Sequence, residues 1–214
     1  MILHRDARCV AVAKPPGVAT HRGWADDDDP LLQQVRDAVG AYVYPIHRLD
    51  RGASGIVLFA LDRDAARAFS AAWPDADKRY LAITRGHPPE HVVIDHPIPK
   101  APGEQRVPAI TEIWRTDTFG RYALVEARPH TGRLHQIRRH LKHVACPLIG
   151  DVRYGKGEHN RLFRERFALH RLALHCTALR VAHPDGGELA VTCALAPDLA
   201  AALAAARAAF AEPR

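Results

Sequence analysis

Residues 45–60 have the sequence PIHRLDRGASGIVLFA, and this stretch decides how we interpret the chain. A single carboxylate, Asp50, stands between Arg48 and Arg51, and a turn separates it from the apolar run 56–60, which predicts a buried strand. A carboxylate beside guanidinium groups is stabilised in its charged form, which suits a nucleophile and not a general acid. We therefore predict that Asp50 is a nucleophile in a loop that the core supports. A solvated turn carboxylate is the alternative.

The length of 214 residues, with no Ser/Gly-rich or Pro-rich linker, predicts one domain over residues 1–214. The cysteines stand far apart and form no CxxC pair; they are Cys9, Cys146, Cys176 and Cys193. No signal peptide is recognisable before them, and no apolar stretch approaches the length of a membrane span. We expect a protein of the reducing cytoplasm with free thiols and no membrane association.

The charge balance favours a polyanionic partner. The formal net charge is +6 with a pI near 9.4, and only five of the 30 basic residues are lysine. Arginine binds phosphate bidentately and stacks on nucleic-acid bases. An Ala- and Arg-rich composition that only reflects a GC-rich genome is the competing explanation, so the charge alone does not establish nucleic-acid binding.

Hydrophobic periodicity predicts strands alternating with helices. The predicted strands cover residues 2–4, 9–13, 56–60, 78–84, 109–118, 122–128, 172–182 and 188–195. The predicted helices cover residues 31–39, 63–73, 131–143 and 197–210. For the helix at 31–39 we expect Asp29 as the N-cap and Pro30 as the first helical residue, and we expect Pro97 to Pro108 to be an exposed loop. Sequential hairpins with helices between them predict an α+β fold on a mostly antiparallel sheet.

The segment 131–143, TGRLHQIRRHLKH, predicts a basic amphipathic helix. Its two faces are an apolar one, with Leu134, Ile137, Leu141 and Val144, and a charged one, with His135, Arg138, Arg139 and Lys142. We expect the first face to pack inward and the second to point outward toward phosphates; an ordinary solvated face is the alternative. Backbone N–H groups at Thr131 and Gly132 could meet a phosphate as well.

We predict no metal site. Three histidines, His135, His140 and His143, lie close in sequence, but zinc needs converging ligands and these diverge around the helix. The acidic run 26–29 is better explained as a helix start. Tyr80, beside Lys78 and Arg79, is either a core aromatic or a platform on which a base stacks.

Six segments of the chain, in this order, resemble motifs of the RluA-type pseudouridine synthases. They are KPPG at 14–17, HRLDRGASG at 47–55, KRY at 78–80, TGRLHQIR at 131–138, PLIGD at 147–151 and LALH at 172–175. The resemblance implies a single α+β catalytic domain. Its sheet would be mixed and mostly antiparallel, flanked by helices, with a central basic cleft, and with no separate S4-type RNA-binding domain.

The resemblance also implies roles for individual residues. Asp50 would be the nucleophile, Arg133 would pair with it, Tyr80 would stack on the uracil, and Arg48 would enter the gap that the extruded nucleotide leaves. The expected RNA-binding residues are Lys14, Arg22, Lys78, His135, Arg138, Arg139 and Lys142, together with Arg48. The reaction isomerises uridine to pseudouridine and needs no cofactor and no nucleotide.

Within the family the resemblance is strongest to a small tRNA-directed branch that acts on uridine 65. Three stretches support this choice: HRGW at 21–24, RYALVE at 121–126, and RRHL at 138–141, which leads to PLIGD at 147–151. We therefore expect RNA, and specifically tRNA, as the partner of a monomer. Two departures from the family pattern are Ala53, where a Thr is usual, and a short segment 95–109. Two alternatives stay open: ribosomal RNA as the substrate, and a non-catalytic RNA-binding module. A hydrolase lacks an evident second catalytic carboxylate, because Asp62 and Asp64 fit helix capping better.

Overall fold

The structure is a computed structural model and describes residues 2–21, 29–100 and 103–211. The chain forms two compact units. The first unit comprises Met1–Lys78 and Cys176–Ala194, and the second comprises Arg79–His175 and Leu195–Arg214. No helix within the described residues is both long and apolar enough to cross a membrane.

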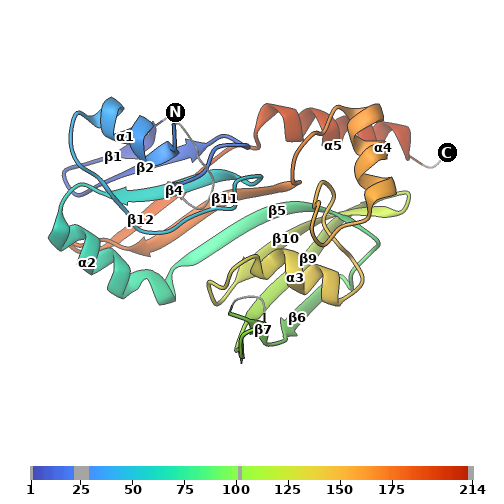
Figure 1. Ribbon diagram of the computed structural model, residues 1–214, viewed down its shortest axis with the longest axis horizontal. Coiled ribbons are helices and arrows are strands. Elements are labelled where there is room, and N and C mark those ends of the chain that lie inside the picture. The colour runs from blue at the N-terminus through green and yellow to red at the C-terminus, as the bar shows by residue number, and fades with distance from the viewer. Residues whose placement is uncertain (1, 22–28, 101–102, 212–214) are drawn as a thin grey trace. The chain divides into compact units, whose positions relative to one another are not determined.

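The strands of the first unit run side by side in the order β1-β2-β4-β11 (Figure 1), with β3 paired to β4 and β12 paired to β11. Their bounds are β1 Ile2–Arg5, β2 Cys9–Lys14, β3 Tyr44–Pro45, β4 Ser54–Ala60, β11 Leu174–Ala182 and β12 Glu188–Thr192. The pairs β1·β2, β2·β4, β3·β4 and β11·β12 are all antiparallel. All seven residues of β4 are buried. The apolar run after Asp50 is therefore the buried strand that the sequence predicts.

Two helices belong to the first unit, α1 (Leu31–Val39) and α2 (Arg63–Ala72), and a short 3-10 turn, η1 (Trp73–Asp75), follows α2. Asp62 caps α2 as expected, because its carboxylate accepts the Ala65 N–H at 2.8 Å. The predicted cap of α1 is wrong. The helix begins one residue later, with Pro30 in the N-cap position and no side-chain cap. Its first N–H groups instead donate to the carbonyls of residues 19 and 20, so the preceding chain satisfies them.

The strands of the second unit follow the order β5-β10-β9-β6. Their bounds are β5 Asp77–Arg85, β6 His91–Asp95, β9 Ile110–Phe119 and β10 Tyr122–Pro129. All three pairings are antiparallel, and β9 and β10 form the predicted hairpin. Both units thus confirm the predicted α+β class with mostly antiparallel strands.

The predicted loop from Pro97 to Pro108 is wrong in part, because it contains a second small hairpin. Strands β7 (Ile98–Pro99) and β8 (Arg106–Val107) pair there. Ile98 is buried, and Arg106 donates to the Pro97 carbonyl at 2.8 Å. Proline is tolerated at the end of a strand and in pairs as short as this one. The prolines of this segment suggest a loop, so the sequence alone does not reveal the strands.

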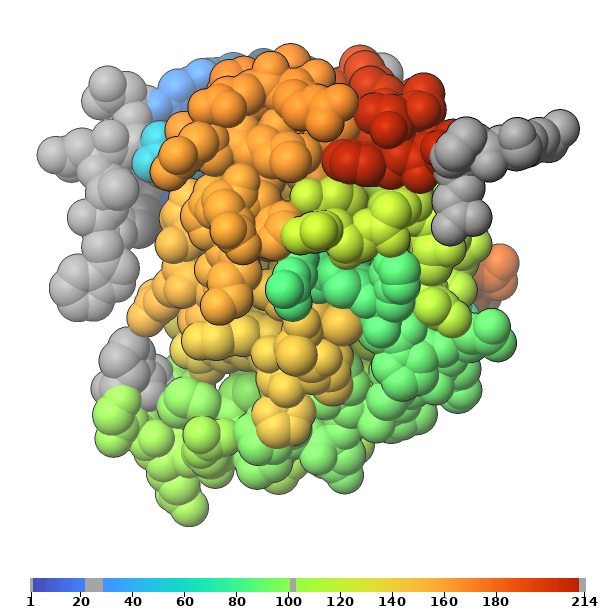
Figure 2. Space-filling model, turned by 90° about the vertical axis from the view of Figure 1, so that its right-hand side faces the viewer, coloured from blue at the N-terminus to red at the C-terminus, as the bar shows by residue number. Residues whose placement is uncertain are grey.

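The helices of the second unit are α3 (Gln136–His143), α4 (Gly157–Phe167) and α5 (Pro197–Ala209). Figure 2 shows α4 in orange beside α5 in red, above the yellow-green turn between β9 and β10. These three elements contribute to the core of the unit, in which the largest side chains are those of Phe119, Tyr122, Phe163 and Phe167. Sequence periodicity predicts α5 but not α4.

Candidate active site

Asp50 lies in a tight turn of the first unit, directly before β4. The Ala53 N–H donates to the Asp50 carbonyl at 3.0 Å, which closes the turn, and Ala53 is buried. One residue earlier, the Leu49 N–H and carbonyl both bond to the hydroxyl of Thr20, at 3.2 and 3.3 Å. Asp50 itself is only partly exposed. A half-exposed carboxylate on a backbone that is fixed on both sides has the placement that a nucleophile needs.

The loop 14–17 holds the other side of this turn. The Gly17 N–H donates to the Arg51 carbonyl, and Arg51 Nε donates back to the Gly17 carbonyl, both at 2.8 Å. Lys14 is only 1% exposed, and its ammonium donates to the carbonyls of Pro15, Val18 and Arg51 at 2.8, 2.7 and 3.2 Å. The expectation that Lys14 contacts phosphate is therefore wrong. Its three protons point to backbone oxygens, and its role is to hold the turn.

A stack of side chains supports the start of the motif. The His47 ring lies on the Trp73 ring with centroids 4.4 Å apart, and the Lys78 ammonium lies 5.3 Å from the centre of the same indole. His47 Nε2 accepts the Leu58 N–H at 3.1 Å, which ties the motif to β4. Burial, with a smaller contribution from Lys78, lowers the pKa of His47 to about 3, so the ring stays neutral. Lys78 is itself buried, which contradicts an exposed RNA-binding role.

Tyr80 lies on β5 in the second unit, where it pairs with Ala127 of β10. It is 8% exposed, so most of its ring is covered. Its neighbour Arg79 forms an ion pair with Glu126 at 2.6 Å and lies 5.2 Å from the centre of the Trp114 ring. The strand therefore fixes Tyr80 firmly. The choice between core packing and base stacking stays a prediction.

Arg133 lies in the loop before α3, and Gln136 organises that loop. The Gln136 amide donates to the Ile110 carbonyl at 2.8 Å and to the Thr111 hydroxyl at 2.9 Å. Its oxygen accepts the Thr131 hydroxyl at 2.7 Å and the Arg133 N–H at 3.0 Å. Both amide protons and both lone pairs are thus used. The Arg133 N–H is therefore already bonded within the loop. The expected contact of the Thr131 and Gly132 N–H groups with a phosphate stays a prediction. The exposed Arg133 side chain donates from Nε to the Pro108 carbonyl at 3.2 Å.

The loop ends at His135, whose backbone φ of 55° lies in the left-handed region that favours glycine. Strain of this kind persists only where the surroundings enforce it, and it is common at functional sites. Helix α3 therefore starts five residues later than predicted. Leu134, expected on the apolar face, is 37% exposed, because it precedes the helix.

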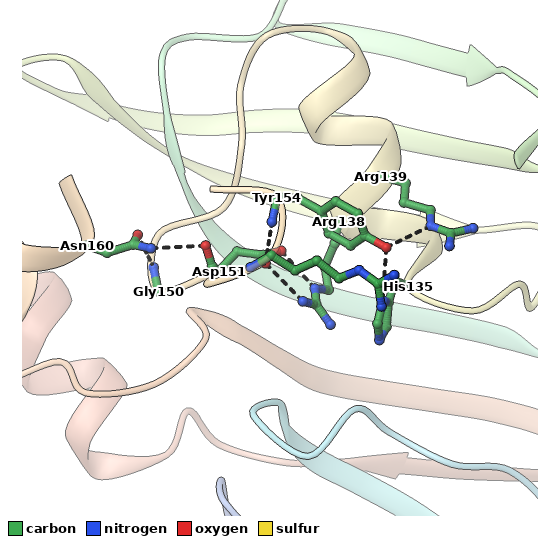
Figure 3. A network of polar contacts seen from close by, with 8 residues as sticks. His135, Arg138, Arg139, Gly150, Asp151, Tyr154 and Asn160 are labelled. Atoms are coloured by element: carbon green, nitrogen blue, oxygen red, sulfur yellow. Dashed lines mark hydrogen bonds and ion pairs between the residues drawn. The ribbon is translucent and has the colours of Figure 1, made fainter. Parts of the chain in front are cut away.

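Arg138 does not point outward from α3, which corrects a second predicted phosphate contact. It is 9% exposed and donates to Asp151 through Nε at 2.7 Å and through Nη2 at 2.9 Å (Figure 3). The Asp151 carboxylate also accepts the N–H groups of Arg153 and Tyr154, both at 2.9 Å. Burial alone would raise the pKa of Asp151, but these hydrogen bonds outweigh it and leave the pKa below its usual value. The bidentate pair fixes α3 to the loop after residue 150.

Tyr154 contacts the other basic side chains of the predicted charged face, those of Arg139, His135 and Lys142. Its hydroxyl accepts Arg139 Nε at 3.0 Å and lies 3.2 Å from His135 Nδ1 (Figure 3). Arg139 also donates to the Pro99 carbonyl at 2.7 Å. The Lys142 ammonium is 5.9 Å from the centre of the Tyr154 ring, and this lysine is exposed. Of the predicted charged face, Lys142 is exposed and Arg139 and His135 are half-buried, so only this part can meet RNA directly.

The structure leaves three predictions open. Asp50 belongs to the first unit and Tyr80 and Arg133 to the second, so the pairing of Asp50 with Arg133 and the central cleft stay predictions. Arg48 is exposed, as a residue entering an RNA duplex must be. Arg22 lies outside the described residues.

Sequence reasoning missed residues that hold the site rather than form it. Thr20, Gln136 and Tyr154 are uncharged, so the charge pattern of the sequence does not single them out, although Gln136 lies within the motif TGRLHQIR at 131–138. Asp151 was visible as the last residue of PLIGD, but nothing in the sequence connects it with Arg138, 13 residues earlier. Only the turn between α3 and α4 brings the two together.

Comparisons with known proteins show the family of the chain. A sequence profile described as RNA pseudouridylate synthase matches residues 8–143. The tRNA pseudouridine synthase C of Vibrio cholerae and that of Haemophilus ducreyi are each 38% identical, over 86% of this chain and 85% of the relative. Among solved structures, human RNA pseudouridylate synthase domain containing 4 has a TM-score of 0.79 and 26% identity, over 96% of this chain and 92% of that one. The chain therefore belongs to the RNA pseudouridylate synthase family, whose enzymes isomerise uridine to pseudouridine in RNA.

Proposed function

We propose that the chain converts a uridine of tRNA, uridine 65, to pseudouridine, with Asp50 as the nucleophile. The observation that carries the proposal is the Asp50 turn, which hydrogen bonds from the loop 14–17 and from Thr20 hold rigidly while the carboxylate stays partly exposed. The names of the relatives at 38% identity support tRNA as the substrate.

The reaction breaks the bond between C1′ of the ribose and N1 of the base and forms a bond between C1′ and C5. The hydrogen on C5 leaves to solvent and N1 gains one, so no redox partner is needed. Asp50 would either attack C1′ or assist the loss of uracil with proton removal at C2′. In both routes the carboxylate must be ionised and aimed, and we assign that task to an ion pair with the Arg133 guanidinium.

The target base must leave its stack before the ribose can be reached, at a cost of a few kcal/mol. Tyr80 would stack on the extruded uracil and offset part of this cost, and Arg48 would occupy the gap that the base leaves. The cations that we assign to phosphates are Lys142, the half-buried Arg139 and Arg22. Because each phosphate contact releases counterions, affinity for RNA should fall steeply as salt rises.

The test is release of tritium from RNA labelled at C5 of uridine. Full-length chain should release tritium from a tRNA transcript, and carbodiimide treatment with reverse transcription should map the product to position 65. A matched transcript with cytidine at position 65 lacks the target uridine. Its tritium release should therefore be lower than that of the first transcript by one equivalent per tRNA. Release from ribosomal RNA fragments but not from tRNA would overturn the tRNA assignment. Release from neither would favour the non-catalytic alternative.

A further inference from the structure

The turn between β1 and β2, in the first unit, brings together side chains for which the proposed function has no use. They are His4 on β1, Asp6 in the turn, and Cys9 at the start of β2. One donor atom from each lies within 4.8 Å of the other two. His183, which follows β11, points to the same place, with its Nε2 at 3.3 Å from Asp6 Oδ2.

One carboxylate oxygen is the centre of this cluster. Asp6 Oδ1 is occupied, since it accepts the N–H groups of Arg8 and Cys9 at 2.7 and 2.8 Å. Asp6 Oδ2 is surrounded by His4 Nε2 at 2.7 Å and Cys9 Sγ at 3.5 Å, as well as by the His183 nitrogen. The backbone therefore fixes the carboxylate and aims its second oxygen at a nitrogen and a sulfur.

One of these separations already equals that of a tetrahedral zinc site, and a second needs a small adjustment. With zinc bonds of about 2.0 Å to oxygen or nitrogen and 2.3 Å to sulfur, ligand atoms lie about 3.5 Å apart for O and S and about 3.3 Å for O and N. The Asp6–Cys9 separation of 3.5 Å already matches. The His4–Asp6 separation of 2.7 Å is that of a hydrogen bond, and the imidazole would have to retreat by about 0.6 Å to admit the ion.

A β-bulge puts His4 on the correct face of the strand pair. The register shifts between residues 2 and 4, so that His4 lies opposite Ala11. Residues opposite each other in an antiparallel pair share a face, and so do Ala11 and Cys9, two apart on β2. Without the shift His4 would face Val10 and point to the other side of the sheet, away from Cys9.

Charge and burial also favour a cation here. Three carboxylates lie around the turn, those of Asp6, Asp62 and Asp185. Within the part of the chain that the structure describes, one guanidinium, that of Arg8, pairs with the last two, at 2.9 and 3.3 Å. Cys9 is fully buried, while the His4 and Asp6 side chains are 36% and 31% exposed, so two of the three donors face solvent and the thiol lies behind them.

We propose that His4, Asp6 and Cys9 bind a divalent transition-metal ion, and that a mixed N, O, S donor set suits zinc best. Water would complete the tetrahedron. His183 is a positioning residue, because its Nδ1 accepts the Asp185 N–H at 3.2 Å, which leaves the proton on Nε2, facing Asp6. On binding, the Cys9 thiol loses its proton to solvent as the metal–sulfur bond forms. The ion would fasten the first two strands of the unit together.

The test uses tag-free, chelator-treated full-length chain titrated with Co²⁺, which reports a thiolate ligand by a charge-transfer band in the near ultraviolet. We expect one equivalent to bind, with displacement by Zn²⁺. Cys9→Ser should abolish the band, and His183→Gln should weaken binding by about tenfold or more. The control is Cys193→Ser, which removes another buried thiol of the same unit and should leave the band unchanged.

Because Cys9 lies in the core, its variant could fail to fold, and His4→Gln provides the second test. This side chain is partly exposed, so its loss should weaken Co²⁺ binding by about tenfold or more without unfolding the protein. If the wild-type chain shows no band, the proposal is contradicted, and the cluster is a turn that is held by hydrogen bonds without a metal. A band that survives in both Cys9→Ser and His4→Gln, or that disappears in Cys193→Ser, also contradicts it. None of these results bears on pseudouridine formation.

Discussion

Lys14→Met should separate two roles for a buried lysine beside the Asp50 turn. The ammonium donates three hydrogen bonds, at 2.7 to 3.2 Å, to backbone carbonyls that include that of Arg51. Hydrogen bonds to a charged group contribute about 1.5–3 kcal/mol each, but removing the lysine also removes the cost of burying its charge. We therefore expect a net loss of about 3 kcal/mol in the free energy of unfolding, which lowers Tm by about 6–12 °C for a chain of this size.

The assay combines thermal unfolding, single-turnover tritium release and the salt dependence of tRNA binding. Lys14→Met should lower Tm and the rate, because the turn loosens, but leave the slope of log affinity against log salt unchanged. The matched control is Lys142→Met on the exposed face of α3, which should keep Tm and reduce that slope by about 0.7–0.9. If Lys14→Met keeps Tm and reduces the slope, Lys14 binds phosphate and our assignment of it to the turn is refuted.

Three further variants test the site and its support. Gly55→Ala should lower the free energy of unfolding by about 3 kcal/mol, because φ is 110° and a methyl group there overlaps the backbone of β11. The control is Gly157→Ala, whose methyl group meets open space and should leave the free energy of unfolding unchanged; chemical denaturation measures both. Asp151→Asn should cost about 3–5 kcal/mol, since it removes the charge that neutralises Arg138. Its lowered pKa stabilises the fold above about pH 4, so the difference between wild type and variant should shrink on acidification; a pH-independent difference would exclude this pair. Arg133→Lys keeps the charge but not the two-pronged geometry, so kcat should fall by about 10- to 100-fold, and an unchanged kcat would exclude the proposed pair.

The sequence predicts those parts of the fold in which the pattern is local. The apolar run of β4, the Asp62 cap of α2 and the β9–β10 hairpin all depend on residues close in sequence, and all are confirmed. Helix α4 was missed because its sequence is mostly polar, and the apolar residues that bury it, Phe163 and Phe167, pack on partners from elsewhere in the unit.

The functions of charged residues depend on contacts distant in sequence, and there the predictions failed. From the sequence, Lys14 and Arg138 are simply two positive charges, and a positive charge suggests a phosphate ligand. Their partners are backbone carbonyls and the carboxylate of Asp151, which no periodicity reveals. Basic composition therefore overestimates the RNA-binding surface, because part of the positive charge lies inside the protein.

The most direct test of the assignment is Asp50→Asn, measured by single-turnover tritium release with enzyme in excess over labelled tRNA. The substitution keeps the backbone hydrogen bond of the turn, which the Asp50 carbonyl accepts from the Ala53 N–H, and replaces the charged carboxylate with a neutral amide of the same shape. We predict no release above background, with Tm and tRNA binding on a filter unchanged. Release at the wild-type rate would contradict the nucleophile assignment.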